Sequence, residues 1–316
     1  MKTKVYLFAV GLLAACSASA INLDMVRVGD AGNANDTTGY GGVDYEYNIG
    51  TYEVTNAQYA EFLNSVAKTS DTHSLYNGNM GSSSFGGITR SGSAGNYTYS
   101  AKSGSENKPV NYVSFWDAAR FTNWLTNGQP TGVQGALTTE TGVYNLGGGA
   151  ITRNAAAWAS GGFAIASENE WYKAAYYQPA AAGGDSDDYW LYPTQSNSIS
   201  TADANYDFVV RTLTDVGSYS DAGSYYGTFD QGGNVWEWND EILFASTRGL
   251  RGGSFGGNDF SLQSSSRANG DPADEDITVG FRVSSLAAVP DESSTISLLM
   301  ATLSLLIAFK KGRRTL

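Results

Sequence analysis

The chain of 316 residues is poor in the side chains from which most redox and zinc sites are built. It holds one cysteine and one histidine, so it can form neither a disulfide within the chain nor a zinc site made of thiolates. It has 19 basic against 31 acidic residues and a net charge of −12, which argues against nucleic acid as a partner because phosphates require Lys and Arg. The chemistry that remains belongs to oxygen, in carboxylates, amides, hydroxyls and carbonyls.

Aromatic side chains and glycine, by contrast, are abundant. Hydrophobic residues make up 41% and aromatic residues 13% of the sequence, which is enough to bury a sizeable core and excludes wholesale disorder. The 38 glycines indicate a fold rich in loops rather than a helical bundle. No tandem repeat or long linker interrupts residues 21–288, so we expect one domain there.

The first 20 residues have the pattern of a secretory signal peptide. Lys2 and Lys4 precede an apolar run over residues 5–15, and Ala18-Ser19-Ala20 forms a small-residue cleavage site. Cleavage after Ala20 leaves a chain without cysteine. An alternative stays open, because the residues before Cys16 resemble a bacterial lipobox, in which Cys16 would be lipidated.

The last segment, residues 289–316, has the pattern of a sorting or anchoring tail. Val289-Pro290-Asp291 is followed by an apolar run over residues 295–309 and a basic cluster over residues 310–314. This order resembles the PEP-CTERM class of bacterial sorting tails, in the variant that begins Val-Pro-Asp. The resemblance implies an exosortase-type protease as partner, delivery to the cell surface or extracellular matrix, and membrane contact only through this segment. The alternative is a plain tail anchor.

Three helices are predicted from capping patterns. They begin at Thr55, Ser114 and Ser167, each of which is followed three residues later by Gln, Asp or Glu. Behind each cap, apolar residues recur at helical spacing and form a stripe that we expect to be buried. The members of these stripes are Tyr59, Phe62, Leu63, Val66, Ala118, Phe121, Trp124, Leu125, Trp171, Ala174 and Ala175.

Short strands are predicted around the helices. They cover residues 48–54, 162–166, 249–255 and 280–284, while the glycine-rich stretches 81–95 and 147–149 are expected to be surface loops. Few helices, short strands and much irregular chain indicate an α+β domain.

Six segments, in order, resemble the formylglycine-generating-enzyme-like (sulfatase-modifying factor) family. Together they span roughly residues 45–285. The resemblance implies a compact fold related to C-type lectins, with little regular secondary structure and two structural calcium ions. The segments are 52–56 (YEVTN), 109–114 (PVNYVS), 167–175 (SENEWYKAA), 233–238 (GNVWEW), 251–255 (RGGSF) and 280–283 (GFRV).

The catalytic chemistry of that family does not carry over. Its enzymes oxidise a sulfatase cysteine with copper held by two cysteines after the Gly-Gly-Ser motif, and here Gly257 and Leu262 stand at those positions. We therefore expect no formylglycine-generating activity and neither copper nor zinc. A non-haem iron centre usually needs two histidines and a carboxylate. His73, in a loop rich in Ser and Asn, is expected to be a surface histidine.

The resemblance does carry over a calcium loop at residues 230–237. It implies that Asp230 and Glu237 give side-chain oxygens to the ion, while Gly233 and Val235 give backbone carbonyls. Two carboxylates offset part of the charge of Ca²⁺, and the glycines let the backbone curl around it. The alternative is that Glu237 only caps a buried loop.

A second calcium loop matches less of the family pattern. Asn205 and Tyr206 match its beginning and would give an amide oxygen and a backbone carbonyl, with Asp207 as the candidate carboxylate. The residues after Asp207 depart from the glycine-rich pattern of the enzymes.

The family pocket is expected to survive only as a vestige. Trp236 and Ser254 match residues that line it, and Gly257 and Leu262 replace its cysteines. Trp171, Trp236 and Trp238 are expected to be core residues rather than the walls of a groove.

The expected function is that of an exported, calcium-stabilised surface or matrix protein with a catalytically degenerate domain. Such a module would bind an extracellular polysaccharide or a surface protein, which is an analogy drawn from the fold. Two alternatives stay open. One is an oxidoreductase of the formylglycine-generating or non-haem iron superfamily with a cysteine-free centre, and the other is a purely structural surface protein.

Overall fold

The computed structural model describes residues 20–148, 151–244 and 246–287. The predicted sorting tail and the predicted signal peptide, apart from Ala20, lie outside these residues. Within the described ranges, no helix is long and apolar enough to cross a membrane. Ile21 is fixed to the domain by Gln129, whose amide accepts from the Ile21 N–H at 2.7 Å and donates to its carbonyl at 3.0 Å.

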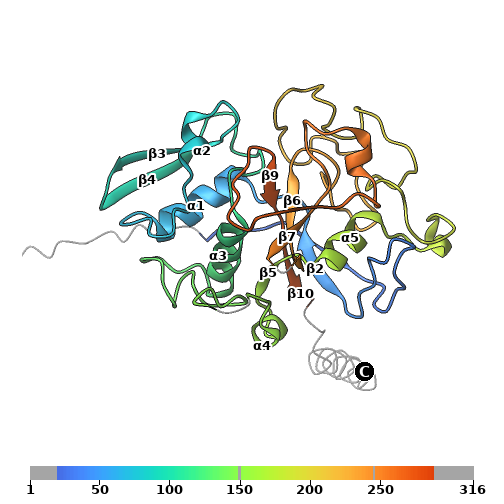
Figure 1. Ribbon diagram of the computed structural model, residues 1–316, viewed down its shortest axis with the longest axis horizontal. Helices are drawn as coiled ribbons and strands as arrows, with labels where there is room; N and C mark the ends of the chain where they lie inside the picture. Colours follow the sequence, from blue (N-terminus) through green and yellow to red (C-terminus); the bar gives the residue numbers. More distant parts are fainter. Residues whose placement is uncertain (1–19, 149–150, 245, 288–316) are drawn as a thin grey trace, which may run out of the picture.

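Two four-stranded sheets form the centre of the molecule, with the hairpin β3–β4 to one side (Figure 1). The first sheet has the strand order β1-β2-β10-β5 and is antiparallel throughout. The second has the order β8-β7-β6-β9, in which only β6 and β9 are parallel. The strands are β1 (Met25–Val28), β2 (Tyr47–Gly50), β3 (Ile88–Ser93), β4 (Asn96–Ala101), β5 (Phe163–Ile165), β6 (Trp236–Leu243), β7 (Thr247–Arg251), β8 (Ala268–Gly270), β9 (Val279–Phe281) and β10 (Val283–Leu286).

The three longest helices begin at the residues that the capping patterns predict. Thr55, Ser114 and Ser167 each accept a hydrogen bond from the backbone three residues on, and the side chain of that residue bonds back to the cap. The apolar stripes behind all three caps are buried, as expected. The helices are α1 (Asn56–Val66), α2 (Gly78–Ser82), α3 (Phe115–Thr126), α4 (Ala155–Ala159) and α5 (Glu168–Tyr176), with short 3-10 turns at Ala180–Ala182 and Asp259–Leu262.

The strands end earlier, or divide, where the chain has to turn. The predicted strand 48–54 ends at Gly50, and the predicted strand 249–255 ends at Arg251, where Gly252 and Gly253 adopt positive φ angles of 96° and 76°. The predicted strand 280–284 is two strands in different sheets, β9 and β10, which are divided at Arg282.

The glycine-rich stretch 81–95 is not a plain surface loop, contrary to expectation. It contains the end of α2 and the whole of β3, which pairs with β4 across a turn formed by Ala94 and Gly95. Gly95 has a φ of 94°, which suits a tight hairpin turn. The turn chemistry was present in the sequence, but the exposed, polar strands lack a strong period-two pattern.

Figure 1 shows α1 and the hairpin on one side of the two sheets, and α5 with the long loops of residues 177–235 on the other. The largest apolar cluster packs α1 and α3 against both sheets, and includes Phe62, Phe121, Trp238 and Phe281. A second cluster packs α5 against β2 through Tyr47, Ile49 and Trp171. The loops that carry the predicted calcium residues lie on the α5 side.

Candidate cation site and neighbouring pocket

The loop at residues 230–235 is folded tightly against the loop at residue 205. Asp230, Gly233 and Asn234 have φ angles of 59°, 85° and 56°, so the backbone curls through the left-handed region three times in five residues. The Asn234 N–H donates to the Asn205 carbonyl at 2.8 Å, and the Gly233 N–H donates to the Gly252 carbonyl at 2.9 Å. The two segments predicted to bind calcium are therefore neighbours in space.

Glu237 lies at the centre of a buried ion pair. Its two carboxylate oxygens accept from Nε and a terminal nitrogen of Arg282, each at 2.6 Å, and one also accepts from Nε1 of Trp171 at 2.7 Å. Both partners of the ion pair are fully buried. Three of the six motif segments meet at this carboxylate, which is a structural role that the sequence did not predict.

The cluster around Glu237 contains more negative than positive charge. Burial raises the pKa of Asp230 to about 6, and the nearby Glu237 adds to this, although the Gly217 N–H and Arg282 oppose it. Burial, followed by Asp230 and Glu237, raises the pKa of Glu53 well above its usual range. Three carboxyl groups thus share one guanidinium group, and the raised pKa values show that burial disfavours the charged forms of Glu53 and Asp230. A bound cation would favour those charged forms.

These residues fit a calcium ion in part. Glu237 already has a cationic partner, so Asp230 is the side chain of the loop best placed to supply new charge, although it also accepts from the Gly217 N–H at 2.6 Å. In the described part of the chain, no group of three or more His, Cys, Asp or Glu side chains gathers closely enough to hold a metal. A calcium ion here would depend on the backbone carbonyls of Gly233 and Val235, a ligand type that calcium accepts.

The loop at residues 205–207 fits the prediction at one residue and departs from it at another. Asn205 is buried, and its Oδ1 has no hydrogen-bond partner among the described residues. Such an oxygen is suited to act as a ligand of a cation. Tyr206 is also buried. Asp207, the candidate carboxylate, is exposed, and its N–H donates to the Gly257 carbonyl at 2.7 Å.

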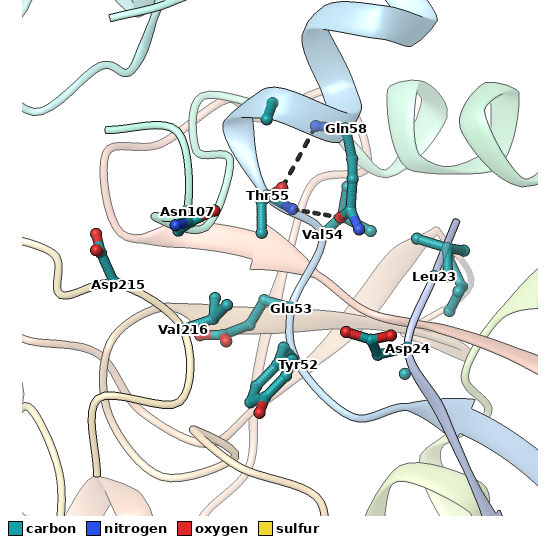
Figure 2. A pocket seen from close by; sticks show the side chains of 13 residues that line it. Leu23, Asp24, Tyr52, Glu53, Val54, Thr55, Gln58, Asn107, Asp215 and Val216 are labelled. Carbon is teal, nitrogen blue, oxygen red and sulfur yellow. Dashed lines mark hydrogen bonds between the residues drawn. The ribbon is translucent and has the colours of Figure 1, made fainter. Parts of the chain in front are cut away.

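A cavity of about 500 Å³ lies beside this cluster, where the end of β2 leads into α1 (Figure 2). Glu53 lines it together with Asp24, which precedes β1, and Asp215, which lies in the loop after residue 205. Tyr52 and Asn107 are among the other polar residues of its wall. The ring of Tyr52 is held by stacking on Phe229, with 5.7 Å between ring centroids.

A family model described as the sulfatase-modifying factor enzyme 1-like domain matches residues 41–286, which is more than half of the chain. The chain belongs to this family. The resemblance inferred from the six segments is thereby confirmed. No curated protein matches the chain in a sequence comparison.

Solved structures are similar to this sulfatase-modifying factor enzyme 1-like domain. CarF has 20% sequence identity and a TM-score of 0.54 over 84% of this chain and 99% of its own. Treponema denticola variable protein 1 has 19% identity and a TM-score of 0.55 over 86% and 98%. PvdO from Pseudomonas aeruginosa has 15% identity and a TM-score of 0.45 over 84% and 92%. The likenesses to CarF and to Treponema denticola variable protein 1 support the mixed α+β fold.

In this member of the family, the residues at the two positions that the resemblance matches to cysteines take part in the packing. Leu262 is fully buried and packs with Tyr192 and Tyr206, while a Cβ at Gly257 would lie 2.5 Å from Oγ of Ser261. Ser254 is buried, and Trp236 packs against a different apolar cluster from Leu262. The four residues of the predicted vestigial pocket therefore do not share one apolar cluster.

The burial of three tryptophans and the exposure of the histidine were also predicted from the sequence, and the structure tests these predictions. Trp171 and Trp238 are core residues, as predicted, and Trp236 is partly buried against the core. His73 is exposed and lies 3.4 Å from a carboxylate oxygen of Glu140. The prediction of a surface histidine is confirmed.

Sequence reasoning missed Asp24, Glu53 and Asp215 as members of one site. Glu53 belongs to the motif segment 52–56. Its position next to the buried Val54 was the only feature of the sequence that could have indicated a site residue there. Asp24 and Asp215 look like ordinary surface acids in the sequence, and only the fold brings them to the same cavity.

Proposed function

We propose that the chain is an exported, calcium-stabilised binding module of the bacterial surface or matrix, without formylglycine-generating activity. The observation that carries this proposal is the identity of positions 257 and 262, which are Gly and Leu. A Cu(I) centre of the family type needs two thiolates there. The packing of Leu262 among tyrosines supports the same conclusion, because it fills the position with an apolar side chain.

Calcium is proposed as a structural ion held by the loop at residues 230–237. The raised pKa values of Glu53 and Asp230 beside Glu237 support this, because a cation would favour the charged forms of these carboxyl groups. The unpartnered Oδ1 of Asn205 in the neighbouring loop supports it as well. A bound divalent cation stabilises the folded state by mass action, since the unfolded chain has no assembled site.

Export and sorting are proposed from the two terminal patterns. The signal peptide would direct the chain out of the cytoplasm, and an exosortase-type protease would process the tail at residues 289–316. At the surface, the domain would bind an extracellular polysaccharide or a surface protein. Of these two ligands, a glycan is supported by the fold analogy with lectins and by the polar cavity beside the acidic cluster.

Metal analysis of the purified full-length chain by mass spectrometry tests the proposal. We expect calcium at about one or two ions per chain, and a melting temperature that falls when a chelator is added. Asp230→Asn should remove the response to chelator. Asp44→Asn is the matched control, because Asp44 is exposed and lies outside the acidic cluster and both calcium loops. Stoichiometric iron or copper would overturn the proposal and favour an oxidoreductase.

A further inference from the structure

The cavity beside the acidic cluster is lined by acidic residues and, in the part of the chain that the structure describes, by no basic side chain. Asp24, Glu53 and Asp215 line it from three different segments, and none of its described lining residues is Lys or Arg (Figure 2). Its volume of about 500 Å³ lies within the range typical of small-molecule sites. A ligand that enters it meets negative charge from several sides.

Glu53 is the feature that distinguishes this cavity from an ordinary acidic surface. Its side chain is almost completely buried, with 2% exposed, and Oε1 accepts from the Asn234 amide at 3.1 Å. Oε2 is buried and has no hydrogen-bond partner within the described residues. A buried carboxylate oxygen without a donor is costly, and burial raises the pKa of Glu53 accordingly. A positively charged donor that reaches this oxygen would stabilise the charged form of Glu53.

We propose that the cavity binds the primary ammonium group of an amino sugar, with the ammonium against Glu53 and the sugar hydroxyls toward Asp24, Asn107 and Asp215. An ammonium group supplies three donors and a charge, which makes a charge-assisted bond to a carboxylate. This deepens the glycan-binding role proposed above and rests on it, because it names the sugar class and the site.

An organic cation fits the cavity better than a bare metal ion does. Within the described part of the chain, the carboxylates here do not form a group close enough to coordinate a metal. The cavity also has room for far more than one ion, and its wall offers polar groups at several points together with Tyr52, whose ring is held by Phe229. A hexosamine spans such a space and satisfies separated acceptors at once.

Calorimetric titration of the full-length protein with glucosamine, at constant calcium, tests the proposal. Glucose and N-acetylglucosamine serve as probes that keep the hydroxyls but lack the ammonium, and we expect them not to bind measurably. Glu53→Gln should weaken glucosamine binding about 10- to 100-fold, as expected for the loss of a bond between charged groups. Glu61→Gln, on the exposed face of α1, is the matched control and should bind as the wild type does.

A second variant keeps the test independent of the fold around Glu53. Asp24 and Asp215 are both exposed, so the double variant Asp24→Asn, Asp215→Asn should fold normally and weaken binding by about fivefold or more. The proposal is overturned if Glu53→Gln binds glucosamine normally, if glucose binds as well as glucosamine, or if calcium competes with glucosamine.

Binding of the wild-type protein to extracellular polysaccharide separates this inference from the broader one. If the polysaccharide is retained while glucosamine fails to bind, the cavity assignment is wrong and the binding role stands. If neither binds, the proposed binding role falls as well.

Discussion

Glu53 and Glu237 are carboxylates of the same buried cluster, but they have opposite surroundings. Glu237 is held by Arg282 and Trp171, so that both its oxygens have charged or polar donors. Glu53 has one amide donor and a second oxygen without a partner. The partnered carboxylate joins elements of the fold, whereas the unpartnered one borders a cavity.

The difference shows how one cluster can serve two purposes. A buried charge that is paired and hydrogen-bonded is compatible with a stable fold, while an unpaired one reduces stability unless something binds to it. Binding sites commonly contain groups that are unsatisfied in the empty state, because the ligand supplies the missing partner. Variants at the two kinds of carboxylate should therefore change stability in opposite directions.

The largest effect is expected from removing the charge that holds the cluster together. Arg282→Met leaves Glu237 buried without its cation, next to Glu53 and Asp230, and should lower the free energy of unfolding by about 3–5 kcal/mol. Urea unfolding measures this loss. Arg27→Met, in the exposed pair with Glu46, is the control and should cost less than about 1 kcal/mol. Equal losses in the two variants would contradict the comparison.

A large pH effect is expected from Asp117, a buried carboxylate that caps α3 and has no paired guanidinium. Burial raises its pKa to about 7, and Glu275 adds to this, although Ser114 and Arg120 oppose it. Between about pH 4 and pH 7 the folded state holds a proton that the unfolded state has lost, so stability falls as pH rises, by up to about 1.4 kcal/mol per unit.

Asp117→Asn removes this titration. Urea unfolding from pH 4 to pH 8 should show a weaker decline in stability with pH for the variant than for the wild type. The Ser114 cap can still bond to the asparagine oxygen, so the helix should remain. An identical decline in both proteins would show that Asp117 is ionised throughout.

The opposite sign is expected at the unpartnered carboxylate. Glu53→Gln keeps an oxygen that can accept from Asn234 and replaces a carboxyl group whose charged form burial disfavours. The free energy of unfolding should therefore stay unchanged or rise by about 1–3 kcal/mol without ligand at pH 7. Chemical unfolding measures it directly. A loss of stability as large as that of Arg282→Met would mean that Glu53 is as fully compensated as Glu237.

A smaller effect is expected where a partnered carboxylate also caps a helix. Glu170 accepts from the Ser167 N–H at 2.8 Å and from Arg153 at 2.7 Å; burial would raise its pKa, but Arg153 lowers it. Ser167→Ala removes only the cap hydroxyl and should lower the free energy of unfolding by about 1 kcal/mol. Thermal unfolding checks this against Ser160→Ala, an exposed control expected to change stability by less than about 0.5 kcal/mol.

The helices were predictable from the sequence because their signals are local. Thr55, Ser114 and Ser167 bond to residues three positions away, and the apolar stripes follow at once. Strand ends were less predictable because they depend on distant partners. The break at Arg282, for example, follows from its pairing with Glu237 in the neighbouring sheet, and no pattern within residues 280–284 reveals it.

The candidate site was predictable only where it lies within one motif. The loop at residues 230–237 could be found from its glycines and acidic residues. The exposure of Asp207 could not be predicted, because it depends on how the loop at residues 205–208 packs against residues 255–257. The cavity was missed because Asp24, Glu53 and Asp215 are far apart in sequence. Their proximity is a property of the sheet and loop arrangement.

The strand order β1-β2-β10-β5 has a consequence for the route by which the domain folds. β2 lies between the first strand of the described chain and the last, with Ile49 opposite both Val26 and Ser284. Contacts of such long sequence separation slow folding, because a large loop must close before they form. A chain that emerges gradually from its N-terminus cannot complete this sheet until β10 is available, so the domain acquires its native core late and in a cooperative step.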